Sequence, residues 1–217
     1  MRLRQLRVLG RRGQAGRKGI ALKRFYNVLR TILADAVSRI TPAARFRVRP
    51  LRRSDCGDLI KNYFSYYDEL RTSPDFGIVF YRKKPSYHAE LKWFESLYRS
   101  VSSGNTIASV AEADGKAVGL CQVTRLRPGS EVDHVAELGI AIIRGYRSIG
   151  AGSALIRDVL RRGKGFETVK LSVFSSNTAA KRLYRRMGFR KYGTFRRSIK
   201  RGGRYVDEDL MRFDRTG

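Results

Sequence analysis

A short glycine-rich loop is the segment of this chain whose residue types most directly suggest chemistry. Its sequence, RSIGAG at 147–152, stands between a run of strand-forming residues and an amphipathic pattern over 153–162. The first N–H groups of a helix have no internal partner, and the helix dipole favours an anion there. Gly150 and Gly152 would let phosphate oxygens approach closely, and Arg147 adds positive charge. The loop is therefore predicted to bind a pyrophosphate, with a plain glycine-rich turn into a helix as the alternative.

Two better-known phosphate loops fit this segment poorly. Gly145 and Gly150 have the spacing of a P-loop, but Ala151 and Gly152 replace the Lys-Ser/Thr pair that such a loop requires. A dinucleotide-binding GxGxxG motif is excluded because Leu155 stands where its third glycine belongs.

A second block of sequence follows the loop at a short distance. Residues 171–189 read LSVFSSNTAAKRLYRRMGF. Together, RSIGAG and this block resemble the two signature motifs of the GNAT superfamily of N-acetyltransferases, in the same order and spacing. The resemblance covers about Phe46 to Phe213. It implies a mixed, mostly antiparallel α/β sheet with helices on both faces, acetyl-CoA as cosubstrate and a primary amine as acceptor.

The resemblance also assigns residues to acetyl-CoA. The backbone of 140–142 would pair with the pantetheine arm, the amides of 149–152 would take the pyrophosphate, and an N–H near Ile140 would face the thioester oxygen. The implied cofactor-binding residues are Ile140, Ala141, Ile142, Arg147, Ser148, Ile149, Gly150, Ala151, Gly152, Ser153, Asn177, Ala180 and Tyr184. For Asn177, helix capping is an equally good reading.

Two catalytic residues follow from the same comparison. Glu137 precedes the pantetheine-binding residues and is the candidate general base, directly or through a water. It shares a strand face with Gly139 and Ala141, so its role depends on which face meets the substrate. Tyr184 is the candidate general acid for the departing thiolate. The alternatives are a surface carboxylate in a salt bridge and a core aromatic. Cys121 is interpreted as a core residue, without acyl-enzyme chemistry.

The remaining pattern predicts the elements that hold these residues. Strands are expected at 46–51, 106–113, 116–126, 131–143, 168–174, 190–199 and 204–213. Helices are expected from Ser54 through Phe64, at 86–101, 153–162 and 177–189. Asp114-Gly115 is a hairpin signal, and Gly202-Gly203 joins the last two strands.

Charge is the strongest bias in the composition. The chain has 217 residues, with 46 Lys and Arg against 19 Asp and Glu, for a net charge of +27. Residues 1–43 are expected to form a basic extension with an amphipathic helix over about 21–40, and 44–217 the catalytic domain. Such charge attracts polyanions. A non-catalytic module that binds nucleic acid or the ribosome is therefore the alternative function.

Other features bound the partners. Neither the two cysteines nor the two histidines have metal-ligand spacing, so no metal is expected. No apolar run is long enough to span a membrane, and a cytoplasmic location is expected. A homodimer is left open.

The acceptor region is expected to include aromatic and acidic residues from the first two helices, their connecting loop and the last hairpin, namely Tyr63, Tyr66, Tyr67, Asp68, Glu69, Tyr81, Trp93 and Tyr205.

Overall fold

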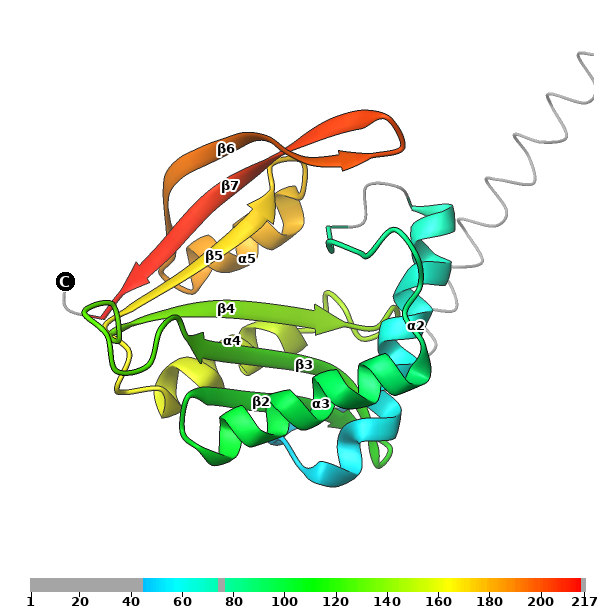
Figure 1. The fold of residues 1–217 in the computed structure, drawn as a ribbon, viewed down its shortest axis with the longest axis horizontal. Coiled ribbons are helices and arrows are strands. Elements are labelled where there is room, and N and C mark those ends of the chain that lie inside the picture. Colours follow the sequence, from blue (N-terminus) through cyan, green and yellow to red (C-terminus); the bar gives the residue numbers. More distant parts are fainter. Residues whose placement is uncertain (1–44, 74–76, 216–217) are drawn as a thin grey trace, which may run out of the picture. The chain divides into compact units, whose positions relative to one another are not determined.

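A seven-stranded sheet forms the frame of the domain (Figure 1). The computed structural model describes residues 45–73 and 77–215. The extension at 1–43, with its expected helix over 21–40, lies outside the described residues. The strand order is β1-β2-β3-β4-β5-β7-β6, and the β4–β5 pair is parallel while the other neighbours are antiparallel. The strands are β1 (Arg47–Pro50), β2 (Thr106–Ala113), β3 (Lys116–Arg125), β4 (Val135–Ile142), β5 (Thr168–Phe174), β6 (Arg190–Arg201) and β7 (Arg204–Asp214).

Helices cover both faces of the sheet, as expected for this fold class. They are α2 (Cys56–Thr72), α3 (Tyr87–Ser102), α4 (Ala151–Arg162) and α5 (Thr178–Arg186), with a short 3-10 turn η1 (Arg53–Asp55) before α2. On one face, Leu59 of α2 and Phe94 of α3 pack on Val110 of β2. On the other face, Leu155 of α4 and Tyr184 of α5 pack with strand residues in the larger core. The mixed α/β architecture predicted from the sequence is confirmed.

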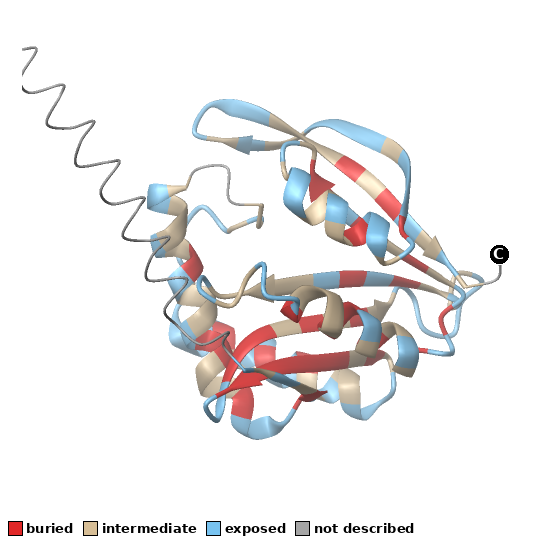
Figure 2. Cartoon of the chain, turned by 180° about the vertical axis from the view of Figure 1, so that it is seen from behind, coloured by how far each residue is buried: buried red, intermediate tan, exposed pale blue. Residues whose placement is uncertain are grey.

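Burial differs between the central strands of the sheet and the edge strand β6. Figure 2 shows buried residues concentrated on the central strands, whereas β6 is mostly exposed along its length. Cys121 in β3 is fully buried, which confirms its interpretation as a core residue. The two predicted hairpin turns also form, with Asp114 at φ 49° and Gly115 at φ 75° in the first. Positive φ at both central positions is the backbone that twisted strands require.

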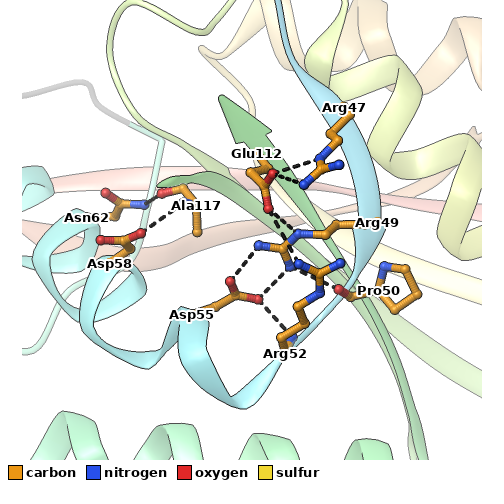
Figure 3. A network of polar contacts seen from close by, with 9 residues as sticks. All are labelled: Arg47, Arg49, Pro50, Arg52, Asp55, Asp58, Asn62, Glu112 and Ala117. Atoms are coloured by element: carbon orange, nitrogen blue, oxygen red, sulfur yellow. Dashed lines mark hydrogen bonds and ion pairs between the residues drawn. The ribbon is translucent and has the colours of Figure 1, made fainter. Parts of the chain in front are cut away.

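The start of α2 differs from the prediction that placed its cap at Ser54. Ser54 lies inside η1, and Asp55 precedes the first residue of α2. The reason is an ion cluster at this point (Figure 3). The Asp55 carboxylate accepts the Arg52 N–H at 2.8 Å and both terminal nitrogens of Arg49 at 2.7 and 2.8 Å. Glu112 of β2 binds the same Arg49 from the other side.

Side chains of α2 fix this helix to the edge of β3. Asp58 accepts the backbone N–H of Ala117 at 3.0 Å, and the Asn62 amide donates to the Ala117 carbonyl at 2.7 Å (Figure 3). Both bonds are made to the second residue of β3, which stands opposite Glu112 of β2. They hold α2 in place. The next turns of this helix face β4, and the candidate site lies between them.

Candidate active site

The two central strands β4 and β5 separate along their length (Figure 1). They pair only from Val135–Thr168 to Glu137–Lys170. Beyond that point the residues 138–142 of β4 have strand partners in β3 but none in β5 within the described chain. The sheet therefore opens into a gap that exposes one edge of β4.

Backbone alternation tells which residues face the gap. Ile143 donates its N–H to Val118 of β3, and the Val135 carbonyl accepts from Leu126, so the odd-numbered residues of β4 point to β3. Even-numbered residues point the opposite way. The N–H and carbonyl of Ile140 therefore face the gap and can pair with an extended ligand or with a developing oxyanion.

The gap leads to the N-terminus of α4. Gly150 caps the helix with φ 92°, a left-handed conformation that glycine adopts without strain, and it offers no side-chain acceptor to the first-turn N–H groups. The first turn contains no acidic residue. Ser148 also has a positive φ of 63° and is exposed. This helix end offers free N–H donors and a positive dipole end to an anion.

Gly152 has a packing role in addition to any role toward phosphate. A Cβ at this position would lie 2.9 Å from Cδ2 of Leu183 in α5. The next nearest atoms belong to Ile142 and Ile140 of β4. The absence of a side chain lets the first turn of α4 sit directly against β4 and α5. Among its neighbours, Ala151 is buried, Ser153 half-buried and Ile149 exposed.

Arg147 is held by protein groups on both ends of its guanidinium. Its Nε donates to the Ile142 carbonyl at 2.7 Å, and its terminal nitrogens bind both carboxylate oxygens of Glu69 in α2. The positive charge expected to attract phosphate is thus paired with an acid 78 positions away. The contact connects α2 to the loop before α4.

Glu137 lies at the point where β4 and β5 part. It is exposed and stands opposite Thr124 on β3 and Lys170 on β5. Its face of the strand is shared with Gly139 and Ala141, which line a cavity on the α2–α3 side of the sheet. The carboxylate therefore points to the side on which a substrate has room.

Tyr184 occupies the opposite face of the sheet. It is 8% exposed, its ring packs 5.9 Å from Phe189, and its hydroxyl makes no hydrogen bond to a described residue. Burial, and secondarily the Cys121 sulfur, raise the pKa of Tyr184 well above its ordinary value. Cys121 stands opposite Ile140 in the β3–β4 ladder. The phenol is therefore a protonated donor on the side of β4 where Ile140 also packs.

Asn177 caps α5, as its position predicted. Its side-chain oxygen accepts the Ala180 N–H at 3.0 Å. A Cβ on Gly77 would lie 2.5 Å from the Asn177 amide nitrogen, so the loop after α2 runs directly past this cap. The same loop is bound from the β6–β7 hairpin, where Arg201 donates to the Ile78 carbonyl. These contacts connect the two sides of the gap.

A cavity of about 190 Å³ lies beside the exposed edge of β4. Residues 139–141 of β4 form one side of it. Its walls are apolar or aromatic side chains, namely Leu59, Tyr63, Tyr66, Ile78, Trp93 and Leu120. Two amide side chains, Asn62 and Gln122, complete the lining.

The residues predicted for the acceptor region divide into two groups. Tyr63, Tyr66 and Trp93 line the cavity. The others do not. Tyr67 packs on Phe80, Glu69 pairs with Arg147, Asp68 and Tyr81 are exposed, and Tyr205 lies on the β6–β7 hairpin beneath Arg197.

Sequence reasoning missed the other lining side chains, namely Leu59, Asn62, Ile78, Leu120 and Gln122. Gln122 could have been found, because it is a polar residue within an otherwise apolar strand sequence, KAVGLCQV. Ile78 gave no such signal, since an isolated aliphatic residue in a loop is common.

Within the described residues, no three His, Cys, Asp or Glu side chains are placed to hold a metal ion. None of the described helices is long and apolar enough to cross a membrane.

Comparison with known proteins decides the family. The sequence profile of the acetyltransferase (GNAT) family matches residues 65–189, more than half of the chain. The chain belongs to the GNAT family. The matched range includes both the RSIGAG loop and the helix that carries Tyr184.

One curated relative is similar in sequence, and two solved structures are similar in fold. The chain is 32% identical over 106 residues to L-amino acid N-acetyltransferase AaaT of Escherichia coli (strain K12), over 47% of this chain and 64% of that protein. It thus spans less than two thirds of that relative. An N-acetyltransferase structure from Staphylococcus aureus Mu50 has a TM-score of 0.66 at 20% identity, covering 78% of this chain and 98% of the other. The structure of yncA from Salmonella typhimurium with its cofactor acetyl-CoA has a TM-score of 0.65 at 19% identity, covering 78% and 94%.

The site of this GNAT protein fits acetyl-CoA. The uncapped α4 N-terminus suits a pyrophosphate, and the free edge of β4 suits the amide groups of a pantetheine arm. Gly152 and Arg147 hold the loop against β4, and so fix the α4 N-terminus relative to the free edge of this strand.

Proposed function

We propose that this chain transfers the acetyl group of acetyl-CoA to a primary amine by direct attack in a ternary complex. The observation that carries the proposal is the gap between β4 and β5, with an uncapped helix N-terminus at its end. The cavity of about 190 Å³ on the other side of β4 gives the amine a separate approach. Holding both reactants against one strand supplies much of the acceleration in such reactions.

The reaction needs no covalent enzyme intermediate. The lone pair of the neutral amine attacks the thioester carbon, and the carbonyl oxygen becomes an oxyanion near the Ile140 N–H. The carbon–sulfur bond then breaks, giving the amide and a thiolate. Cys121 cannot replace the amine as nucleophile, because it is fully buried and burial raises its thiol pKa.

Two proton transfers accompany the acyl transfer. We assign Glu137 as the group that takes a proton from the amine, directly or through a water, because it is exposed on the cavity face of β4. We assign Tyr184 as the group that donates a proton to the thiolate, because a phenol is protonated at neutral pH and this hydroxyl makes no hydrogen bond to a described residue. Glu137 then releases its proton to solvent, and Tyr184 takes one up from it.

The coenzyme is assigned to the residues implied by the family motifs. The free N–H groups at the start of α4 would bind the pyrophosphate, and the backbone of 140–142 would bind the pantetheine arm. Arg147 would act mainly by holding the loop, since Glu69 already pairs with its charge. Asn177 and Ala180 would contribute through the start of α5, where they hydrogen-bond each other.

The test is amine-dependent release of free CoA thiol from acetyl-CoA, measured for the wild type and Glu137→Gln. We expect release with a primary amine, and a loss of about 100-fold in kcat/KM in the variant. Glu167→Gln is a matched control because Glu167 is an exposed acid outside the gap. Absence of amine-dependent release from wild type that binds acetyl-CoA would overturn the enzymatic proposal.

A second candidate function is binding of nucleic acid or the ribosome. Exposed basic side chains on α5 and β6 favour it, interleaved with exposed Tyr192 and Phe195, namely Arg182, Arg185, Arg186, Arg190, Arg196 and Arg197. Aromatic rings among cations suit backbone contact with base stacking. We assign residues 1–43 as a basic extension and 44–217 as the GNAT domain. Removing the extension should lower RNA affinity and its salt dependence while acetyl-CoA binding survives.

A further inference from the structure

The side-chain oxygen of Gln122 is the unusual polar atom of the cavity. Oε1 is buried and has no hydrogen-bond partner among the described residues. A buried acceptor without a donor costs free energy, and native proteins rarely leave one without a ligand, water or functional reason. The other amide of the cavity differs, because Asn62 already donates to the Ala117 carbonyl at 2.7 Å.

The position of Gln122 ties this atom to the reacting strand. Gln122 stands directly opposite Gly139 in the β3–β4 ladder. A Cβ on Gly139 would lie 3.7 Å from the Gln122 Cγ and 3.9 Å from its Nε2. The side chain of Gln122 therefore folds over Gly139, toward the part of β4 that loses its β5 partner. Glu137 lies on the same strand face, two residues before Gly139.

The other described residues of the cavity lining are uncharged. Leu59, Ile78 and Leu120 contribute aliphatic groups, and Tyr63, Tyr66 and Trp93 contribute rings. Among the residues that the structure describes, no Asp, Glu, Lys or Arg lines the cavity. Its volume of about 190 Å³ is below that of pockets for drug-sized ligands, at roughly 300–1,000 Å³. It suits one apolar substituent rather than a long polar chain.

We propose that this cavity selects acceptors whose primary amine stands next to a neutral apolar side chain, and that Gln122 Oε1 accepts one N–H of that amine. The inference rests on the proposed acetyl transfer and names its acceptor class, a primary amine that carries an apolar side chain next to the amino group. A neutral amine has two N–H groups and one lone pair. One N–H donates to Gln122, the other faces Glu137, and the lone pair remains for the thioester carbon.

The same geometry disfavours acceptors whose side chain is charged. A lysine or aspartate side chain in this cavity would lose its hydration, and none of the described lining residues carries an opposite charge to pair with it. Gln122 is therefore a positioning and specificity residue, and its removal should affect the acceptor and leave acetyl-CoA binding intact.

The experiment compares wild type, Gln122→Met and Thr124→Val as full-length proteins. Leucine, phenylalanine, lysine and aspartate serve as acceptors at saturating acetyl-CoA, and acetyl-CoA affinity is measured by calorimetry. Methionine keeps the length of glutamine without its acceptor. Thr124 is a control from the same strand that hydrogen-bonds Thr106 and does not line the cavity. Thermal unfolding confirms that each variant folds.

We expect wild type to use leucine and phenylalanine at least 10-fold better than lysine and aspartate in kcat/KM. Gln122→Met should lose about 10-fold in kcat/KM for leucine with an unchanged acetyl-CoA Kd, while Thr124→Val stays near wild type. If Gln122→Met misfolds, the preference of the wild type for leucine and phenylalanine over lysine and aspartate alone tests the inference. Equal or better use of lysine or aspartate, or unchanged kcat/KM in a folded Gln122→Met, overturns this inference and leaves acetyl transfer standing. Transfer to no amine overturns both.

Discussion

The guanidinium of Arg147 binds both carboxylate oxygens of Glu69, and this pair joins α2 to the loop before α4. The same guanidinium donates to the Ile142 carbonyl at the end of β4. One side chain thus connects a wall of the apolar cavity with the loop assigned to the pyrophosphate. We propose that Arg147 acts on the coenzyme through the position of the loop.

Glu69→Gln tests that reading of Arg147. Removing the carboxylate charge should weaken a charge-assisted hydrogen bond, lower the free energy of unfolding by about 1 kcal/mol and raise the acetyl-CoA Kd several-fold. Urea unfolding and calorimetry measure the two quantities. Asp68→Asn is the control, since Asp68 is an exposed neighbour. Tighter acetyl-CoA binding by Glu69→Gln would instead make Arg147 a direct phosphate ligand that Glu69 restrains.

Tyr184→Phe separates proton donation from packing. Phenylalanine keeps the ring against Phe189 and removes a hydroxyl that has no hydrogen-bond partner in the described chain. We expect kcat to fall about 100-fold with little change in stability or acetyl-CoA affinity. Steady-state kinetics compare the loss of kcat with acetyl-CoA and with a thioester analogue whose thiol is more acidic. Its better leaving group should be less sensitive to the substitution. An equal loss for both thioesters would remove Tyr184 from the proton-transfer step.

Asp209 should make stability depend on pH. The residue is 4% exposed, and burial alone would raise its pKa. Hydrogen bonds from Lys191, Ser175 and Lys181 outweigh burial and hold the pKa well below the ordinary value of 3.8. Thr194 also donates to this carboxylate. A depressed pKa means that the stabilisation is fully present above the unfolded-state value and is lost as pH falls below it.

Asp209→Asn measures this contribution. At pH 7 the variant should be less stable by roughly 2 kcal/mol, because charged hydrogen bonds become neutral ones. The difference from wild type should shrink as pH falls from about 5 to 3. Urea unfolding at four pH values in that range gives both curves. Parallel curves would show that Asp209 does not titrate abnormally in the folded protein.

The sequence predicted the order of elements because its signals are local. Alternating apolar residues, the Asp114-Gly115 turn and the Asn177 cap each depend on a few neighbouring residues. The same locality explains the error at Ser54. Its capping signal was overruled by Arg49, which draws Asp55 into an ion cluster with β2.

The candidate site was predictable only in part, for a related reason. RSIGAG is contiguous, so its place before α4 followed from the sequence. The Arg147–Glu69 pair joins residues 78 positions apart, and the Gln122–Gly139 contact depends on strand register. A pattern along the chain cannot show which polar residue faces which strand face. The unpaired Gln122 oxygen became visible only once β3, β4 and α2 were assembled.

Calorimetric titration with acetyl-CoA tests the central claim most directly. Wild type is compared with Gly150→Glu and Gly152→Glu, which put a carboxylate at the α4 N-terminus, and with Gly129→Glu as a control in an open turn far along the chain from the loop. The account predicts a Kd in the micromolar range for wild type and control, and loss of binding in both loop variants that remain folded. Wild type that fails to bind acetyl-CoA, or loop variants that bind it as tightly as wild type, would contradict the assignment of this gap to the coenzyme.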